Sequence, residues 1–420
     1  MRASHARHAQ LWLVAVCVAC NFSDVTPTIT QTQHGDITAI TAVHDQNFSH
    51  RLGGVRFVQR GSVDEVIHLA AGMAQKCAAS RVPVSGQKTL VICPSGVPPL
   101  AESRAAVLEE HILTVLSQDD SGIFGPDMGC GSDVLDLLAA RPVVGAHVTG
   151  LSASRYGLDM NARAFTALGC VHALDSYVRL RATRYPRTAV VQGFGAVGAP
   201  IARSLANRGI VVRAVSNTHG ALISERGLDV ERLFTLWLEH GDDCFGAYLS
   251  ARGVYTSFKK SPEALLEVDA ELLVPAARTT VLARVEELGE CRQENADVRS
   301  VERFLDRSEC TFVLEAANHP LSAAAEEYLE SWGVTILPDV LVNVGGMIGC
   351  YAEWRFRELV RAGTLSLDEL ADRCHVHMKR VIEDNIRTLA ATGTSARCSV
   401  SSILLENRAM METRPADLLA

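Results

Sequence analysis

The sequence predicts an α/β protein of two domains, one of them built on a doubly wound, mostly parallel sheet. The chain has 420 residues, more than the roughly 100–200 of one ordinary domain. Its residues are 48% hydrophobic and 21% charged, a balance typical of globular proteins with a large core. From residue 36 onward, short apolar runs typical of buried strands alternate with segments of helical periodicity, and this alternation indicates parallel strands joined by helices.

The predicted elements follow this alternation along the chain. Residues Ser62 and Glu65 form a capping box that opens the first helix, and Gly209 is expected to end the helix that follows the glycine-rich turn at 193–198. We expect helices over 62–79, 102–116, 158–181 and 198–208, and strands over 36–44, 89–93, 187–192, 210–216, 272–274, 311–314 and 335–337. The charged stretch 286–309 is expected to be a solvated surface segment.

Composition argues against several classes of protein. Lys and Arg number 40 against 48 Asp and Glu, a net charge of −8, whereas a nucleic-acid binder normally presents a basic surface. No apolar run reaches the roughly 18 residues of a membrane span, so a cytoplasmic location is expected. The 12 Cys are scattered without framework spacing, which argues against a disulfide scaffold. No metal site is predicted.

The first 27 residues form an N-terminal extension with three possible interpretations. An apolar stretch over 11–20 follows Arg2 and Arg7 and has the length of a signal-peptide core. Cys17 and Cys20 have the spacing of redox and metal pairs, but zinc needs four ligands and no second pair lies nearby. We favour a plain extension or a start codon placed too early over a signal peptide, a membrane tether or a redox pair.

A glycine-rich turn after a predicted strand carries the first chemical signal. Gly193, Gly195 and Gly198 have the spacing of a dinucleotide-binding turn, and they lie between a strand and a helix as that motif requires. Such glycines let the backbone approach a pyrophosphate, which the helix N-terminus then attracts. An acidic residue that would bind the ribose is replaced by Ser216 and Asn217, so both NAD and NADP stay possible.

The second signal is a pair of lysines ahead of an aspartate turn. Lys76 lies on the first predicted helix, with Met73 on the same face, Lys88 follows twelve residues later, and Asp127 lies in a Gly-Pro-Asp-Met-Gly turn. Two amines and one carboxylate could bind an anionic substrate and transfer a proton, because one ammonium lowers the pKa of the other. By spacing alone, solvated lysines and a simple turn former are the commoner explanations.

Taken together, the motifs resemble the glutamate/leucine/phenylalanine/valine dehydrogenases, which are NAD(P)-dependent amino-acid dehydrogenases. The resemblance covers about residues 36 to 390, and its substrate half is most similar to the leucine/phenylalanine/valine branch. The segments that carry it are, in order, ITAVHDQNFSHRLGGVRF, LAAGMAQKCAASRVPVSGQK, GPDMG, FTALG, VVQGFGAVG, LLVPAA, EAANHP and ILPDVLVNVGGMIGCYAEW.

The resemblance implies a role for each matching residue. Lys76 would bind the substrate α-carboxylate, Lys88 would be the general base, and Asp127 would move a proton to and from the amino group. The other substrate-binding positions would be Leu52, Gly53, Gly54, Met73 and Cys350. The cofactor-binding positions would be Thr166, Gly193, Phe194, Gly195, Ala196, Val197, Gly198, Asn217, Ala276, Asn318 and Asn343.

Some positions depart from the family's pattern and bear on the substrate. Ser85 and Gln87 replace glycines of the loop before the catalytic lysine. Leu52 and Cys350 occupy positions that are polar in glutamate-specific members, so the side-chain pocket is expected to be apolar and to take leucine, valine, isoleucine, phenylalanine or tryptophan. The alternatives are a glutamate dehydrogenase that uses Arg51, and a non-catalytic dinucleotide-binding homologue.

The expected organisation is a catalytic domain over 28–165 and a dinucleotide-binding domain over 166–370. Helices over 371–420 are expected to pack back on the catalytic domain, and the active site is expected at the carboxyl ends of the strands, between the two domains. The resemblance implies a homo-oligomer whose only other partner is a small-molecule amino acid.

Overall fold

The computed structural model describes residues 26–44, 48–250, 256–294, 298–392 and 396–413. The expectations for the N-terminal apolar stretch and for Cys17 and Cys20 therefore lie outside the described residues. The chain divides into two compact units: unit 1 comprises Met1–Arg163, Gly346–Val381 and Ser401–Ala420, and unit 2 comprises Ala164–Gly345 and Ile382–Val400. The chain returns from unit 2 to unit 1 after Gly345, whereas the sequence places the end of the dinucleotide-binding domain at residue 370. The difference arises because the helix after Gly345 is bonded to unit 1, as described below.

Unit 1 is built on a five-stranded sheet whose two halves differ in direction. The strand order is β1-β2-β4-β3-β5; β1, β2 and β4 pair antiparallel, while β3 pairs parallel with both β4 and β5. The strands are β1 (Thr28–His34), β2 (Ile37–Val43), β3 (Arg51–Val58), β4 (Ser85–Ile92) and β5 (Gly122–Gly125).

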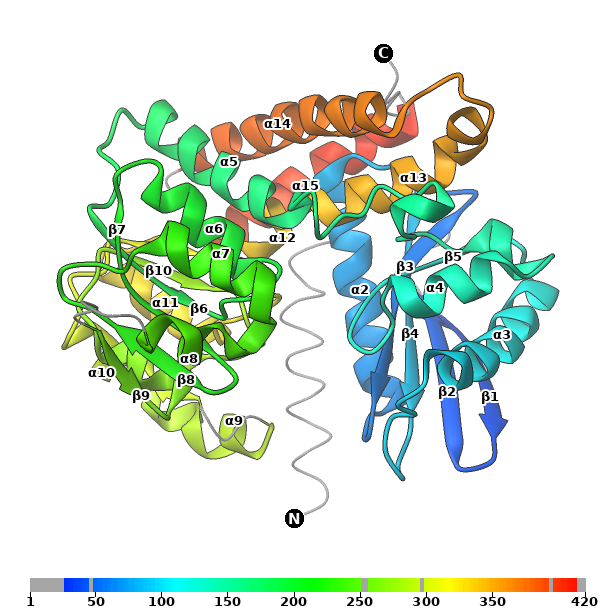
Figure 1. The fold of residues 1–420 in the computed structure, drawn as a ribbon. Coiled ribbons are helices and arrows are strands. Elements are labelled where there is room, and N and C mark those ends of the chain that lie inside the picture. Colours follow the sequence, from blue (N-terminus) through cyan, green and yellow to red (C-terminus); the bar gives the residue numbers. More distant parts are fainter. Residues whose placement is uncertain (1–25, 45–47, 251–255, 295–297, 393–395, 414–420) are drawn as a thin grey trace. The chain divides into compact units, whose positions relative to one another are not determined.

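Helices cover both faces of this sheet (Figure 1). Helix α2 (Val63–Ser80) begins at Ser62, whose side chain accepts the backbone N–H of Glu65, as the capping box predicts. Its Val66 and Ala70 pack against Leu90 on one face, while α3 (Ala101–Gln118) and α4 (Ser132–Ala139) bury a larger core on the other. Unit 1 also holds α13 (Gly345–Arg361) from Gly346 onward and parts of α14 (Leu367–Thr392) and α15 (Ala396–Thr413).

Unit 2 contains the doubly wound sheet that the sequence predicts. The strand order is β14-β13-β10-β6-β7-β8-β9; the first five strands are parallel, and β8 and β9 add an antiparallel edge. The strands are β6 (Thr188–Gln192), β7 (Val211–Asn217), β8 (Gly220–Ile223), β9 (Ser257–Lys259), β10 (Leu272–Pro275), β13 (Phe312–Leu314) and β14 (Thr335–Leu337). The short β11 (Leu282–Ala283) and β12 (Arg299–Ser300) pair separately.

The helices of unit 2 connect these strands across both faces of the sheet, with α6 and α7 in front of it in Figure 1 and α11 behind. They are α5 (Phe165–Leu180), α6 (Gly198–Ala206), α7 (Val230–His240), α8 (Cys244–Leu249), α9 (Leu288–Glu294), α10 (Val301–Leu305), α11 (Ala323–Ser331) and α12 (Asp339–Val342). The predicted fold class, two α/β domains of which one carries a doubly wound sheet, is confirmed.

Three local predictions were wrong in an informative way. The helix predicted over 158–181 begins only at Phe165, because Asp159 and Ala164 adopt left-handed conformations with φ of 47° and 53°. The strand predicted over 89–93 begins four residues earlier, at Ser85, so Lys88 lies within a strand. The segment 286–309 is not wholly solvated, since Val298, Val301 and Phe304 are buried.

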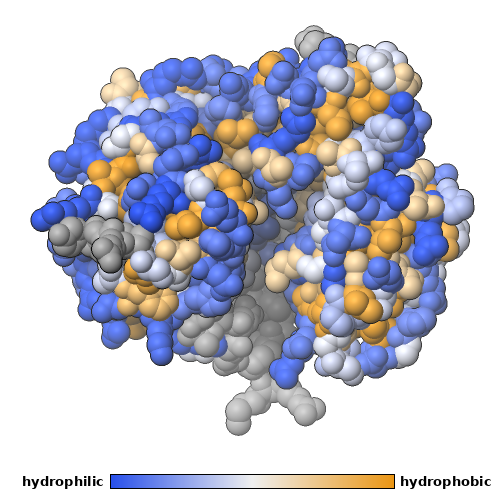
Figure 2. All heavy atoms as spheres, in the orientation of Figure 1, coloured by the Kyte–Doolittle hydropathy of each residue, from blue (hydrophilic) through white to orange (hydrophobic). Residues whose placement is uncertain are grey.

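The surface of each unit mixes polar and apolar side chains. Figure 2 shows hydrophobic residues interspersed among hydrophilic ones on the visible face of both units. Within the described part of the chain, the helices lack the length and apolar character needed to cross a bilayer.

Candidate functional site

The predicted catalytic residues of unit 1 come together on the sheet face that α2 covers. Alternate residues of a strand point to opposite faces, and a Cβ built on Gly86 of β4 would lie 2.2 Å from the backbone nitrogen of Ala74 on α2. Lys88, two residues further along β4, therefore points to the same face. The register pairs Leu52 with Gly86, which places Leu52, Gly54 and Arg56 of β3 on this face as well.

The centre of the cluster is an ion pair between Lys88 and Asp127. The Lys88 ammonium donates to Asp127 Oδ2. Arg56 donates to the same carboxylate through both Nε (3.1 Å to Oδ2) and Nη2 (3.3 Å to Oδ1). The backbone N–H of Met128 completes the set at 2.7 Å from Oδ1. Lys88 and Asp127, 39 residues apart in the chain, are thus in direct contact.

Burial and charge shift the pKa values of both groups. Burial alone would raise the pKa of Asp127, but the two cations Lys88 and Arg56 hold it at about 2. Burial lowers the pKa of the Lys88 amine, the neighbouring Arg56 lowers it further, and Asp127 opposes them without cancelling the effect. A lysine whose pKa is lowered in this way is closer to the working range of a general base.

The glycine pair next to this cluster has no room for side chains. A Cβ on Gly53 would lie 1.6 Å from the carbonyl oxygen of Gln87, and one on Gly54 would lie 2.7 Å from the carbonyl oxygen of Pro126 and 3.2 Å from Lys88 Nζ. These contacts keep the backbone of β3 beside the lysine and the aspartate. Because no side chain projects from β3 at these two positions, a substrate could approach the lysine and the aspartate along the strand backbone.

The remaining substrate-site predictions lie on elements of the same unit. Lys76 and Met73 are half-buried on α2. Leu52 is 2% exposed, and a Cβ on Gly125 of β5 would lie 3.9 Å from the sulfur of Cys350 on α13. Burial raises the pKa of the Cys350 thiol, so this group is an uncharged, weakly polar neighbour.

Arg51 points away from this cluster. As the neighbour of Leu52 on β3 it faces the opposite side of the sheet, where its guanidinium lies 3.0 Å from the Asp119 carboxylate and donates to the Asp119 carbonyl at 3.2 Å. This placement does not support the alternative in which Arg51 binds a substrate side-chain carboxylate.

Ser85 and Gln87 face the same side as Arg51. Ser85 Oγ accepts the backbone N–H of Phe48 at 3.2 Å, and Gln87 Nε2 donates to the carbonyl of Ile123 at 3.4 Å. Because both side chains lie across the sheet from Lys88, these substitutions leave the lysine face unchanged.

The glycine-rich turn of unit 2 has the geometry of a dinucleotide site. Gly193 follows β6 with φ of 92°, and Gly198 opens α6 so close to Gly193 that its Cβ would lie 1.8 Å from the Gly193 carbonyl oxygen. At Gly195, by contrast, a Cβ would meet nothing within 4 Å. The turn is therefore packed against the protein at its two ends and open at its middle glycine, which fits a pyrophosphate at the N-terminus of α6.

Other predicted cofactor residues gather at the carboxyl ends of the neighbouring parallel strands. The backbone N–H of Ala276 donates to the Gln192 carbonyl at 2.8 Å, and Asn343 Nδ2 donates to Asn318 Oδ1 at 3.1 Å. Asn343 Oδ1 is buried without a hydrogen-bond partner, so an acceptor remains for a bound polar group. Thr166 lies in the first turn of α5.

Two predicted cofactor positions have side chains with other tasks. Phe194 is buried against Phe245, with ring centroids 6.3 Å apart, so its backbone alone faces the turn; Ala196 and Val197 are half-buried beside it. Asn217 donates to the Asp242 carbonyl at 2.7 Å and accepts the His219 N–H at 2.9 Å, which occupies both ends of its amide.

Two residues of the site were missed from the sequence. Arg56 could have been found, because strand alternation places it on the face of Gly54. Glu353 of α13 has no local signal: its carboxylate accepts the backbone N–H groups of Gly150 (2.7 Å), Leu151 (3.0 Å) and Leu158 (2.9 Å). These bonds tie α13 to residues 150–158. That segment in turn packs on the aspartate turn, because a Cβ on Gly150 would touch Pro126.

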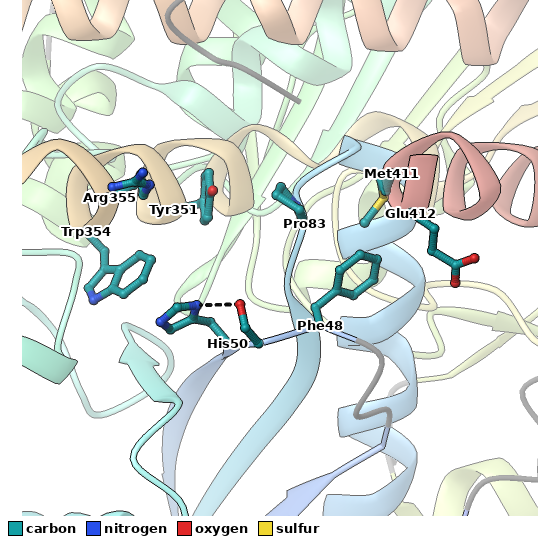
Figure 3. Close-up of a pocket in the computed structure, with 9 residues that line it drawn as sticks. Phe48, His50, Pro83, Tyr351, Trp354, Arg355, Met411 and Glu412 are labelled. Carbon is teal, nitrogen blue, oxygen red and sulfur yellow. Dashed lines mark hydrogen bonds between the residues drawn. The ribbon is translucent and has the colours of Figure 1, made fainter. Parts of the chain in front are cut away.

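Unit 1 also has a pocket of about 790 Å³ that contains none of the predicted site residues. Figure 3 shows His50 and Phe48 from the segment before β3 facing Tyr351, Trp354 and Arg355 of α13 and the end of α15. The His50 and Trp354 rings lie 4.8 Å apart.

Comparison with known proteins finds two matching family models. The model described as Glutamate/Leucine/Phenylalanine/Valine dehydrogenase matches residues 157–412, and the model described as Glu/Leu/Phe/Val dehydrogenase, dimerisation domain matches residues 24–141.

Among curated relatives, the mitochondrial glutamate dehydrogenase of Dictyostelium discoideum is 29% identical over 77% of this chain and 64% of its own length. The NADP-specific glutamate dehydrogenase of a Synechocystis strain is 28% identical over 72% of this chain and 68% of its own length. This chain thus spans less than two thirds of the Dictyostelium protein.

The fold is also similar to solved structures. A crystal structure of the hetero-hexameric glutamate dehydrogenase of Thermus thermophilus, in its leucine-bound form, superposes with a TM-score of 0.69 at 22% identity, covering 97% of this chain and 96% of the other. Since these relatives are named glutamate dehydrogenases, the expected resemblance to the leucine/phenylalanine/valine branch is not supported.

Proposed function

This chain belongs to the Glutamate/Leucine/Phenylalanine/Valine dehydrogenase family, and on that basis we propose that it catalyses the NAD(P)-dependent oxidative deamination of an L-amino acid to its 2-oxo acid and ammonia. The observation that carries the proposal is the contact of Lys88 with Asp127 beside Gly54, in a chain that also has an open dinucleotide turn at Gly195.

In this proposal three charged residues of unit 1, Lys76, Lys88 and Asp127, have separate roles. A bound nicotinamide cofactor would accept hydride from the α-carbon of the amino acid. Lys76 would hold the α-carboxylate, while Lys88, as the neutral amine, would take a proton from the water that attacks the resulting imine. Asp127 would accept hydrogen bonds from the Lys88 ammonium once it forms and from the substrate amino group, and the proton on Lys88 would pass back to that amino group as it leaves as ammonia.

The cofactor would be held at the carboxyl edge of the sheet in unit 2. Gly193, Gly195 and Gly198 would bring backbone N–H groups to the pyrophosphate, and Asn343 Oδ1, which is buried and unpartnered, would accept a hydrogen bond from the carboxamide or a ribose hydroxyl. Because the β7 end carries Ser216 and Asn217 in place of an acid, both NAD and NADP are proposed as cofactors.

Glutamate is the substrate that the names of the relatives favour. A second candidate, an apolar amino acid, is favoured by a specific observation: Leu52, on the lysine face of β3, and Cys350, next to Gly125, are buried and uncharged, and Arg51 is paired with Asp119 on the other face of β3. Burying a side-chain carboxylate without a cation costs several kcal/mol.

One assay separates these functions. The purified protein is given L-glutamate, L-leucine, L-valine, L-isoleucine, L-phenylalanine and L-tryptophan with NAD and then NADP, and reduced cofactor is followed at its absorbance band. A kcat/KM for glutamate above those of all apolar amino acids supports the first candidate, and the reverse order supports the second. Cofactor binding without turnover of any amino acid would contradict both and support a non-catalytic homologue.

A substitution at Leu52 tests the pocket itself. Leu52→Lys places an ammonium on the α2 face of β3, so glutamate turnover should rise relative to leucine turnover, whereas Leu52→Met, as a matched apolar control, should leave the ratio unchanged. An identical glutamate-to-leucine ratio in both variants would show that Leu52 does not face the substrate side chain.

Assembly and location are also proposals. We propose that the chain forms an oligomer of its own copies, supported by the match of residues 24–141 to a dimerisation-domain model; size-exclusion chromatography with light scattering would test this, and a monomer at micromolar concentration would refute it. The cytoplasmic location stays a prediction, and the Dictyostelium relative is named as mitochondrial.

A further inference from the structure

Arg56 occupies a place in the cluster to which the sequence analysis assigns no role. Its Nε and Nη2 atoms meet the two oxygens of the Asp127 carboxylate at 3.1 and 3.3 Å, the two-point geometry in which an arginine fixes both the position and the orientation of a carboxylate. The side chains are mostly buried, with 17% of Arg56 and 16% of Asp127 exposed, so solvent screens this pair only weakly.

The backbone holds this arrangement in place from both sides. The N–H of Phe57, the residue after Arg56, donates to the carbonyl of Met128 at 2.9 Å, while the N–H of Met128 donates to Asp127 Oδ1. Strand β3 and the aspartate turn are therefore joined both by a backbone hydrogen bond, from Phe57, and by the side chain of Arg56.

The charges in the cluster do not balance. Among the residues that the structure describes, Asp127 is the anion that acts on Lys88, whereas Arg56 is a cation beside it. An arginine stays charged at all working pH values, so Arg56 favours two states simultaneously: Asp127 as the anion and Lys88 without its extra proton. The first of these states holds the substrate amine and the second is what a general base requires.

We propose that Arg56 is a positioning residue of this site, which fixes the Asp127 carboxylate at two points and, as a permanent cation beside Lys88, favours the neutral, proton-accepting form of that lysine. This role rests on the proposed deamination, in which Lys88 must accept a proton from water. Arg56 itself touches neither the water nor the substrate in this scheme.

The charged and titratable groups that face Lys88 are few in the part of the chain that the structure describes. They are Asp127, on the turn after β5, and Arg56, on β3; Lys76 lies on α2, the helix over this face. The Cys130 thiol, close to Asp127, stays protonated because burial raises its pKa to about 12. Removing Arg56 therefore leaves Asp127 as the dominant charge on Lys88, and the pKa of Lys88 must rise.

The test is the pH profile of kcat/KM for Arg56→Gln and Arg56→Lys, measured on the full chain with the best amino-acid substrate. In the parent protein kcat/KM should rise with pH as Lys88 loses its proton. Arg56→Gln should move this limb to higher pH by about one unit, which is a tenfold loss of kcat/KM at any pH on the limb. Arg56→Lys keeps the positive charge and should return the limb most of the way to its position in the parent protein. Arg141→Gln removes an exposed arginine paired with Glu109 in the same unit and should leave the limb unmoved.

A second measurement does not depend on turnover. Competitive labelling with acetic anhydride, read by mass spectrometry of the peptide that contains Lys88, gives the pKa of that amine directly in each variant. A raised Lys88 pKa in Arg56→Gln, found in a protein that turns over no amino acid, would support the role of Arg56 and refute the proposed deamination. An unmoved limb and an unmoved Lys88 pKa, in a folded Arg56→Gln with uniformly reduced kcat, would refute the role of Arg56. Should Arg56→Gln fail to fold, a limb in Arg56→Lys shifted by a full pH unit would refute it as well, because the charge is then still present.

Discussion

The perturbation that most directly tests the candidate site is Gly54→Ala. The added methyl group would lie 2.7 Å from the carbonyl oxygen of Pro126, and ordinary contact begins at 3.4 Å, so strand β3 or the aspartate turn must move by about 0.7 Å. The obstructing atom is backbone, which cannot turn aside as a flexible side chain could. The next nearest atoms are Asp127 Cβ at 3.1 Å and Lys88 Nζ at 3.2 Å, so the displacement falls on the proposed base and on the carboxylate proposed to hold the amino group.

The expected loss follows from this displacement. A misplacement of about 1 Å can lower a rate by roughly a hundredfold, so we expect kcat/KM to fall by about 30- to 100-fold, equivalent to about 2–3 kcal/mol of transition-state stabilisation. The cofactor dissociation constant should not change, because the glycine-rich turn lies in unit 2.

The assay is steady-state turnover of the best amino acid, with thermal unfolding of the same samples. Gly289→Ala is the matched control: the same methyl group is added within helix α9, where it would meet no atom within 4 Å, and both turnover and melting temperature should be retained. A folded Gly54→Ala with kcat/KM within threefold of the parent would refute the reasoning, since the lysine and aspartate could not then depend on the backbone of β3.

Three further predictions concern the cofactor turn and the stability of unit 1. Gly195→Ala meets no protein atom within 4 Å, so the melting temperature should be unchanged while the dissociation constant for NAD or NADP, measured by calorimetric titration, rises at least tenfold; unchanged affinity would contradict a pyrophosphate at this turn. Burial lowers the pKa of His111 to about 4, and its ring bonds Thr41 at 2.8 Å in the neutral form, so this group contributes stability above pH 6.5 that is lost as pH falls toward 4. The loss should approach about 3 kcal/mol in urea unfolding, and His111→Gln should flatten that part of the curve; an equally steep curve would exclude His111 as its source. Glu353→Gln should lower the free energy of unfolding by about 3–5 kcal/mol, because the amide nitrogen that replaces one carboxylate oxygen would face the N–H of Leu158 or those of Gly150 and Leu151; a change below about 1 kcal/mol, the size typical of an exposed pair, would show that the carboxylate is dispensable.

The predictions that succeeded rest on local signals. Strand β14 and the N-cap at Ser62 lie where the sequence places them, because short apolar runs and capping boxes depend on neighbouring residues alone. The order of motifs was similarly sufficient to predict the two α/β domains.

The errors concern contacts between distant segments. Residues 158–164 have helical composition, but the N–H of Leu158 is bonded to Glu353, 195 residues away, and Asp159 and Ala164 adopt positive φ. The strand residues Ser85 to Lys88 have weak β propensity and are held by pairing with β2 and β3. No local pattern reports such pairing, so tertiary context overrides propensity here.

The pairing of β3 with β4 and β5 also bears on the two substrates proposed above. Strand alternation gives Leu52 to the lysine face and Arg51 to the other, so the only cation that β3 brings to the cluster is Arg56, and that guanidinium is already held at two points by Asp127. A glutamate side chain on this face could recruit Arg56 only by releasing Asp127, which would raise the pKa of that carboxyl group and leave its orientation beside Lys88 without the two-point contact. Glutamate turnover would therefore require a cation from an element other than β3, whereas an apolar side chain requires no rearrangement of the cluster. The ratio of glutamate to leucine turnover therefore tests whether the site has a cation, other than Arg56, that can pair with a substrate side-chain carboxylate.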